Sequence, residues 1–541
     1  TASNNTAVGS SALNANTTGT ENVAAGRSSL FSNTTGNYNT SDGAYAMKFN
    51  TTGDSNAAFG QGALYYNTTG SLNVAVGRQA LFSNTTADNS TAVGYGALSA
   101  NTTASNNTAN GYKALYANTT GEYNTAVGKS AGAANTTGGS NTFVGGLTGT
   151  ATTTGLANTA IGMQALTTNT TGGNNIAVGK YALLSNTTAS NNTAVGYSAL
   201  NANTIGADNV AVGYTALQSN TTGNGNTANG FQALQSNTTA NNNTAVGFGS
   251  LSANTTGAQN VAHGYQALQL NTTASDNTAV GVQALRYNTT GANNAALGRA
   301  ALYSNTTGAQ NTGMGFHALN ANTTGNNSTA VGYGALRANT TANDNTAVGY
   351  EALTANTTGG SNVAMGLGSL KANITGNSNV SVGLNSMMDN TAGYDNLSMG
   401  HDTMLRNTTG HSNIALGRRA LYNNTTGYDN TSVGKDTLYL STTSVNNVAV
   451  GDSALFNTIS SNNTAVGTSA LKANTTGTGS TAFGYRAGIA TTTGTQNTFI
   501  GSDAGGSNTT GNKNTFIGPD AGYYVTTGSN NTIIGKFNGN V

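Results

Sequence analysis

The stretch Ser90–Gly132, STAVGYGALSANTTASNNTANGYKALYANTTGEYNTAVGKSAG, repeats one phrase and decides the fold. A glycine closes each TAVG-like phrase, at Gly94, Gly111 and Gly128, so the phrase recurs every 17 residues. A fixed period of this kind is typical of architectures in which each repeat stacks on the next one. The sequence therefore predicts a repeat protein rather than a globular domain.

The period extends over the whole chain. The 17-residue step runs from Gly9 to Gly451, one step of 16 residues reaches Gly467, and the longer step then continues to Gly535. This gives 32 such glycines, and we predict a single continuous array over residues 1–541 with no separate domain. Because the chain begins and ends inside the pattern, we expect it to be an excerpt of a longer protein.

The composition narrows the class of protein. The chain has 74 Gly, one Pro, no Cys, only 6% charged residues and a net charge of +1. A nearly neutral chain gives no sign of a nucleic-acid partner, and no apolar run is long enough to insert into a membrane. Without cysteine there is no disulfide framework. The strict register of the apolar positions argues against the disorder that Asn-, Thr- and Gly-rich sequences often show.

The phrase itself predicts strands and turns. With the recurring glycine as position 0, positions −4 to −1 read Asn-Thr-Ala-Val, +3 and +4 read Ala-Leu, and +7 to +10 read Asn-Thr-Thr-Gly. Such short apolar runs cannot form helices, and Thr and Val favour strands. Two short strands with Gly/Asn turns would form one coil of an all-β parallel β-solenoid. Coils about 4.8 Å apart would build a rod on the order of 150 Å long.

Internal covariation predicts which positions share the core. Position +4 is usually Leu and −2 is usually small, but −2 becomes large where the preceding +4 residue is Gly. Such an exchange conserves volume, so +4 and −2 are expected in one packed layer. Gly149 is an exception, because the small Ala160 follows it. The predicted core residues are Leu13, Leu30, Leu64, Leu98, Phe143, Phe499, Phe516 and Ile533, and the four large −2 residues follow Gly132, Gly488, Gly505 and Gly522.

Positions −1 and −3 lie on the other face of the predicted strand and are mostly Val, Ile, Leu, Met, Phe or Thr. A strand that is apolar on both faces is normally buried on both. A thin coil has one lumen, so we expect a second and a third copy of the chain to cover the outer face. The alternative is a wider single-chain coil whose lumen takes both sets of side chains.

Sequence motifs that suggest chemistry have simpler explanations. Gly128–Gly132, GKSAG, matches the G-x-S-x-G nucleophile motif, but that motif needs a strand–turn–helix setting, and both glycines belong to the repeat. The histidines His263, His317, His401 and His411 are scattered. Acidic residues hold no fixed position, unlike those of calcium-binding repeats. We predict no enzymatic activity, no cofactor and no metal.

The +7 column consists mainly of asparagine followed by two threonines. Each such Asn is formally an N-glycosylation acceptor, but glycans on coils about 4.8 Å apart would collide. We therefore predict a structural ladder in which each amide bonds the amides above and below it, as stacked β-architectures favour. Its first members are Asn16, Asn33, Asn50, Asn67, Asn84 and Asn101.

Position +1 is expected to point outward and is often aromatic. Tyr95, Tyr112, Tyr197 and Tyr214 could contact glycans by stacking on sugar rings, although no polar group recurs beside them. The structural explanation is side-by-side packing of neighbouring coils. The regular Thr rows raise ice binding as a further alternative, but these threonines sit beside turn glycines.

The phrase also resembles known repeats. NTAVG at residues 124–128 is similar to the Asn-Ser-Val-Ala-Ile-Gly repeat in the heads of trimeric autotransporter adhesins. The longer phrase NTAVGYxALxANTTG resembles repeats in phage and bacterial tail-fibre-type proteins. This resemblance implies a left-handed parallel β-roll, three chains per fibre, and an extracellular location at a cell or virion surface. The expected function is the structural shaft of such a fibre, with direct glycan adhesion along the shaft and ice binding as alternatives.

Overall fold

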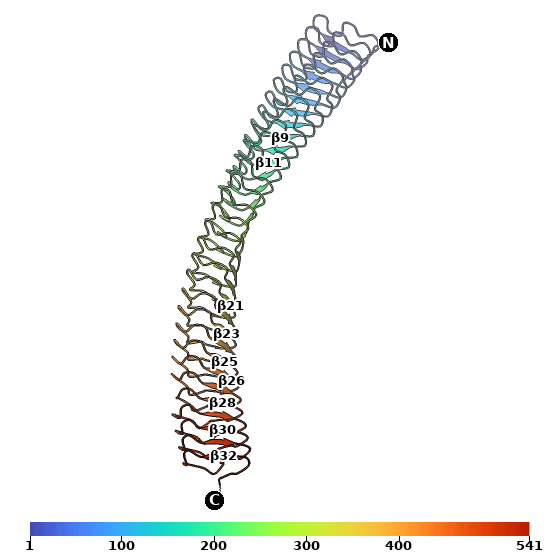
Figure 1. Ribbon diagram of the computed structural model, residues 1–541. Helices are drawn as coiled ribbons and strands as arrows, with labels where there is room; N and C mark the ends of the chain where they lie inside the picture. The colour runs from blue at the N-terminus through green and yellow to red at the C-terminus, as the bar shows by residue number, and fades with distance from the viewer. Residues whose placement is uncertain (540–541) are drawn as a thin grey trace. The chain divides into compact units, whose positions relative to one another are not determined.

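The computed structural model describes residues 1–539, and these residues form stacked coils of a parallel β-solenoid without any α-helix (Figure 1). Two compact units are distinguished, one comprising Thr1–Thr273 and the other beginning at Ala274. Each is built from the same coil. The predicted all-β solenoid of roughly 17-residue coils is confirmed.

Each coil contributes one strand of three residues, at positions −3 to −1. The strands of the first unit are β1 (Thr6–Val8), β2 (Val23–Ala25), β3 (Thr40–Asp42), β4 (Ala57–Phe59), β5 (Val74–Val76), β6 (Thr91–Val93), β7 (Thr108–Asn110), β8 (Thr125–Val127), β9 (Thr142–Val144), β10 (Thr159–Ile161), β11 (Ile176–Val178), β12 (Thr193–Val195), β13 (Val210–Val212), β14 (Thr227–Asn229), β15 (Thr244–Val246) and β16 (Val261–His263). Those of the second unit are β17 (Thr278–Val280), β18 (Ala295–Leu297), β19 (Thr312–Met314), β20 (Thr329–Val331), β21 (Thr346–Val348), β22 (Val363–Met365), β23 (Val380–Val382), β24 (Leu397–Met399), β25 (Ile414–Leu416), β26 (Thr431–Val433), β27 (Val448–Val450), β28 (Thr464–Val466), β29 (Thr481–Phe483), β30 (Thr498–Ile500), β31 (Thr515–Ile517) and β32 (Thr532–Ile534).

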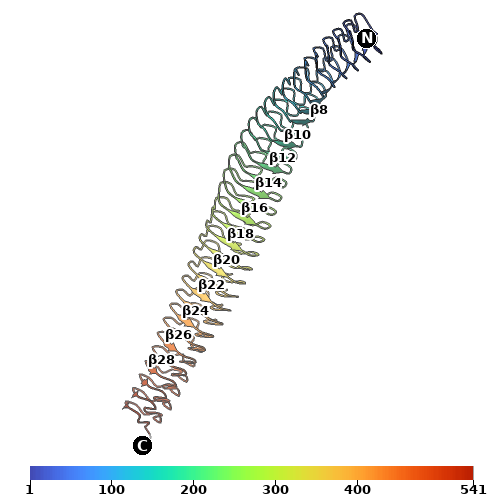
Figure 2. The same ribbon diagram turned by 90° about the vertical axis from the view of Figure 1, so that its right-hand side faces the viewer.

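Within each unit, strands that follow one another in sequence lie side by side and pair in parallel (Figure 2). The register is level: in β6 and β7, Thr91 pairs with Thr108 and Ala92 with Ala109. Every repeat position therefore forms a continuous column of side chains from coil to coil. This column structure gives each outward position its own continuous row on the surface.

The prediction of two strands per coil is wrong, because the second segment turns instead of extending. Residues at +2 and +4 have left-handed backbone conformations, as at Lys113 (φ 53°) and Leu115 (φ 48°), which are incompatible with a strand. The segment is still bonded between coils: Leu98 N donates to Ala114 O at 3.0 Å and Ala100 N to Tyr116 O at 3.1 Å. The backbone polar groups are thus satisfied without a second sheet.

The predicted core layer is confirmed. Leu30, Leu64, Leu98, Phe143, Phe499 and Phe516 are fully buried. Leu13 and Ile533, which lie in the first and last coils of the described chain, are half-buried. Positions +4 and −2 therefore fill the lumen together, as the covariation predicted.

The structure also explains the exception at Gly149. A Cβ atom on Gly132 would lie 2.7 Å from Cδ2 of Phe143, and a Cβ on Gly149 would overlap the same ring. Phe143 therefore occupies the space of two leucines, one in the preceding coil and one in its own coil. Phe499 repeats the arrangement, since Cβ atoms on Gly488 and Gly505 would approach its ring to 2.5 Å and 2.6 Å.

The recurring glycine at position 0 is required by close coil stacking. Gly94 has φ +129°, and a Cβ atom there would lie 2.5 Å from the carbonyl oxygen of Gly111 in the next coil. A side chain would force the coils apart. The single 16-residue coil keeps this close stacking, between Gly451 and Gly467. The missing residue is lost from the turn before the next strand, where Ser460 O takes the place of the usual +10 carbonyl and accepts a hydrogen bond from Asn447 Nδ2 at 2.9 Å.

Candidate functional site

Two buried amide ladders form one side of the interior. At +7 the predicted ladder is present: Nδ2 of Asn67, Asn84 and Asn101 donates to Oδ1 of the preceding Asn at 2.7, 2.8 and 3.1 Å. The same +7 column includes Asn33 and Asn50, and it starts at Asn16, which is half-buried. Because these amides are buried and bonded, the folded chain does not present them to a glycosylating enzyme.

The second ladder, at −4, was not predicted. Asn73 N donates to Asn56 Oδ1 at 3.0 Å, and Asn73 Nδ2 donates to the carbonyl of Ala87 at 2.8 Å. The same carbonyl accepts a bond from Asn84 Nδ2 at 3.1 Å, so one +10 carbonyl joins the two columns. The signal in the sequence was the Asn that precedes Thr-Ala-Val in nearly every phrase.

Interruptions of the +7 ladder leave polar atoms without partners. Thr152 replaces Asn in one coil, and Oδ1 of the neighbouring Asn135 and Oγ1 of Thr152 are buried without a hydrogen bond. Ser441 replaces Asn in another coil, and it leaves Oδ1 of Asn424 buried without a hydrogen bond. An unpaired buried polar atom costs about 1–3 kcal/mol. These coils are therefore local weak points.

The outward face of the strands is apolar and open. Val74 and Val76 of β5 are 37% and 36% exposed, whereas Ala75 between them is fully buried. The alternative of a wider lumen that encloses both faces is therefore wrong. Exposed members of this apolar face include Val23, Phe59, Val127, Ile161, Ile176, Val210 and Val261 in the first unit, and Leu297, Met314, Val348, Met365, Met399, Ile414, Val448, Phe483 and Ile500 in the second.

The aromatic residues at +1 are exposed, as expected, but they stack on one another. Tyr197 and Tyr214 have ring centroids 5.2 Å apart at an angle of 11°, and Phe231 continues the stack at 5.2 Å and 8°. Tyr95 and Tyr112 stack at 5.5 Å and 13°. A sugar that stacks on an aromatic ring needs a free ring face, and in each of these stacks a neighbouring ring covers at least one face.

Charged residues in the first unit fall on two opposite edges of the coil. We call positions +1, +2 and +5 the basic edge; it carries Arg27, Lys48, Arg78, Lys113, Lys129 and Lys180. We call positions +11 and +12 the acidic edge; it carries Glu21, Asp54, Asp88, Glu122 and Asp208. Only Asp42, at −1, departs from this pattern among the charged residues of the first unit. Acidic residues hold no single position, but they do favour one side of the strand.

In the second unit the basic edge carries both signs and forms ion pairs along the column. Lys371 Nζ lies 2.7 Å from Glu351 Oε2. Arg419 donates two bonds to the carboxylate of Asp436, at 2.7 and 2.8 Å, and this bonding raises the pKa of the arginine above its ordinary value. Opposite charges of this edge are therefore paired within the chain at these coils.

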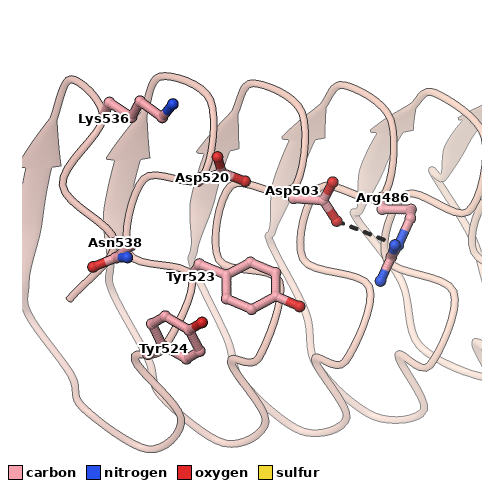
Figure 3. Close-up of a pocket in the computed structure, with 7 residues that line it drawn as sticks. All are labelled: Arg486, Asp503, Asp520, Tyr523, Tyr524, Lys536 and Asn538. Carbon is pink, nitrogen blue, oxygen red and sulfur yellow. Dashed lines mark ion pairs between the residues drawn. The ribbon is translucent and has the colours of Figure 1, made fainter. Parts of the chain in front are cut away.

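The described end of the second unit contains a polar hollow of about 400 Å³ (Figure 3). Arg486 Nε lies 3.3 Å from Asp503 Oδ1 on one side. The other lining residues are Asp520, Tyr523, Tyr524, Lys536 and Asn538. Two carboxylates, Asp503 and Asp520, lie between Arg486 and Lys536 here, which continues the mixed character of this edge.

The candidate catalytic motif does not acquire the setting that it needs. Gly128–Gly132 follows β8 and continues as turns rather than as a helix. Among residues 1–539, no three His, Asp or Glu side chains gather closely enough to hold a metal ion. His317 stacks on Phe316 at 4.0 Å, and burial together with Arg337 and Arg299 lowers its pKa. No helix in the described part of the chain is suited to crossing a bilayer.

Comparison with known proteins adds no relative. No protein family matches the chain, and no curated protein is similar to it. The columns described above are therefore the basis for assigning a function.

Proposed function

We propose that the chain is a non-catalytic structural shaft of an extracellular fibre at a cell or virion surface. In this proposal the coils are left-handed, and three copies of the chain assemble with their apolar strand faces toward a common axis. Continuous columns, dense coil-to-coil bonding and buried amide ladders suit an element that gives length and stiffness. The resemblance of the phrase to adhesin and tail-fibre repeats supports the location and the number of copies.

The apolar strand face carries this proposal. Large side chains such as Phe483, which is 57% exposed, recur on this face in successive coils of each unit. A contiguous apolar surface of this extent is rare on a soluble monomer and marks an interaction site. The row of three-residue strands is apolar in most coils, and polar residues interrupt its −1 column at Asp42, Asn110, Asn229 and His263. An identical row would match it coil for coil and is therefore its simplest partner.

Analytical ultracentrifugation of the full chain tests the proposal. We expect a species with three times the chain mass at micromolar concentration. Val76→Asp and Val127→Asp, which place carboxylates on the apolar face, should shift the protein to single chains. The matched variants Thr86→Asp and Thr137→Asp change exposed +9 residues and should leave the assembly intact. A wild-type chain that sediments as a monomer would overturn the proposal, and a dimer would overturn its threefold part.

Glycan adhesion and ice binding gain no specific support from the side-chain geometry. The +1 rings stack on one another, and the +8 hydroxyls bond backbone, as Thr85 Oγ1 does with Thr102 O at 3.0 Å. A glycan array with Tyr95→Ala and Tyr112→Ala variants, and an ice-recrystallisation assay, test these two alternatives directly.

A further inference from the structure

We propose that neighbouring copies of this chain lie parallel and in register, with the basic edge of one first unit against the acidic edge of the next. The partner is thus a second copy of the same chain. This inference rests on the proposed self-association through the apolar face, and it adds the direction and level at which the copies meet.

The order of positions along the coil places the two edges on opposite sides of the apolar face. Positions +11 and +12 come just before each strand, separated from it by the −4 residue, and +1 and +2 follow it after the position-0 glycine. Five residues stand between +12 and the next +1, so the two are at most about 20 Å apart. When copies turn their strand faces toward one axis, the edge after the strand of one copy meets the edge before the strand of its neighbour. Such a head-to-tail contact closes into a ring.

The charges also match in level. We call the level of one strand a rung. Glu21 and Arg27 flank β2 on the same rung, and Glu122 and Lys129 flank β8 on the same rung. Copies that are parallel and in register place equal rungs side by side, so each glutamate of one copy faces the basic residue of the next.

Each of the other acidic residues of this edge lies within two rungs of a basic residue. Asp54 precedes β4 and Asp88 precedes β6, while Arg78 follows β5, so each carboxylate is one rung from the guanidinium. One rung is about 4.8 Å, which is within the reach of an arginine side chain. Asp208 precedes β13, two rungs from Lys180 after β11. An antiparallel arrangement would lose this level-by-level correspondence.

These charges are not neutralised by opposite charges within the first unit, although Asp54 Oδ1 and Asp88 Oδ1 each accept a bond at 2.6 Å from the backbone N–H of Asn37 and Ser71. No ion pair forms among residues 1–273, all of which the structure describes, whereas Lys371, Arg419, Lys435 and Arg486 pair with carboxylates in the second unit. Several basic side chains lie over aromatic rings instead, as Arg27 does over Tyr45 at 4.4 Å and Lys180 over Tyr181 at 4.7 Å. Such contacts orient a cation and keep its charge. Opposite charges facing each other across an interface fix register and exclude wrong pairings.

A charge-swap experiment on the full chain tests the inference at four exposed positions. One variant, Arg27→Glu with Lys129→Glu, makes both edges acidic at those rungs. A second variant, Glu21→Arg with Glu122→Lys, makes both edges basic. Each should raise the concentration of half-assembly roughly tenfold at low salt, since two contacts become repulsive. The fourfold swap should restore the wild-type value, and the differences should disappear in about 1 M salt.

The control variant has the same change in net charge as Arg27→Glu with Lys129→Glu, but its new charges are at positions that belong to neither edge. Thr35→Glu, Thr86→Glu, Thr103→Glu and Thr137→Glu alter exposed +9 residues and together add four negative charges. If this control weakens assembly as much as the edge reversal does, or if the fourfold swap fails to restore it, the inference is overturned while the proposed shaft stands. A wild-type chain that never associates overturns both.

A label measures the direction of the copies. The chain has no cysteine, so Val8→Cys places a single pyrene on the strand face that is turned toward the common axis, at a residue that is 63% exposed. Parallel copies in register bring the labels together and should give excimer emission. Assembled protein without excimer emission contradicts the parallel arrangement.

Discussion

The first unit carries six basic and six acidic residues and forms no ion pair among them. The second carries twelve and eleven, and there Lys371, Arg419, Lys435 and Arg486 pair with carboxylates. The +7 ladder differs as well: Thr152 is its one break in the first unit, while Ser441, Thr458, Thr491 and Val525 replace Asn in the second. Both units keep the same coil. The lumen and the stacking contacts therefore define the fold, and the edges are free to carry different charge patterns.

The largest effect should come from the aromatic core layer, which the two units share. Phe143→Ala removes a fully buried ring from the space of two leucines, and the local opening free energy should fall by about 3–5 kcal/mol. Native-state hydrogen exchange should show faster exchange around β9 only, because each coil contacts its neighbours alone. Phe499→Ala should behave in the same way in the second unit.

A compensating variant sharpens this test. Phe143→Ala combined with Gly132→Leu and Gly149→Leu recreates the ordinary layer of small −2 and large +4 residues, and it should recover most of the loss. Gly132→Leu alone should destabilise, since its Cβ meets the Phe143 ring. If the triple variant is no more stable than Phe143→Ala, our explanation of the glycines is wrong.

Breaking the +7 ladder of the first unit within its unbroken run from Asn16 to Asn135 should have the next largest effect. Asn84→Ala leaves Oδ1 of Asn67 and Nδ2 of Asn101 without their partner, and we expect a local loss of about 2–3 kcal/mol. Asn424→Ala, which adjoins the natural break at Ser441, should cost less because its Oδ1 already lacks a partner. Equal losses at the two sites, measured by hydrogen exchange, would contradict a cooperative ladder.

The charged edges should respond differently in the two units. Arg419→Met leaves the nearly buried carboxylate of Asp436 with only Lys435, 3.8 Å away, and should cost about 1–2 kcal/mol. Arg78→Met in the first unit breaks no ion pair and should change stability by less than about 0.5 kcal/mol. Thermal unfolding in low and high salt measures both changes. A similar loss for the two variants would remove the contrast between the edges.

The smallest effect concerns pH. Burial and two arginines lower the pKa of His317, so the unfolded chain binds its proton more readily than the folded chain does. Stability should therefore fall as pH decreases below about 6.5, the ordinary histidine pKa, and through the lower folded value. For a half-exposed ring this amounts to a few tenths of a kcal/mol. His317→Gln should flatten this part of the stability profile, and an unchanged slope would show that other groups cause it.

Recurrence in the sequence was enough to predict the columns and the core. A +7 Asn in coil after coil predicts an amide ladder, and the exchange between Phe499 and Gly488 predicts a shared layer. The path of the coil could not be predicted, because left-handed residues at +2 and +4 are ordinary side chains such as Lys113 and Leu115. Glycine usually signals that conformation, and here close packing of neighbouring coils imposes it.

Two further features were visible in the sequence but were not recognised. The −4 Asn recurs as strictly as the +7 Asn, yet it looked like part of a strand. The position of Gly149 seemed exceptional because only the preceding coil was compared with Phe143. Only the three-dimensional arrangement shows that one ring reaches the +4 positions of two coils.

The level hydrogen bonding between coils determines how the chain would respond to mechanical force. The bonds that link Leu98 to Ala114 and Ala100 to Tyr116 join one coil to the next, so tension applied along the stack loads these bonds directly. A terminal coil would detach without disturbing the coils beyond its neighbour. Each detached coil releases 17 residues, which extend to about 55–60 Å from a rise of about 4.8 Å. The solenoid would therefore lengthen in nearly equal steps and dissipate a sudden load one coil at a time.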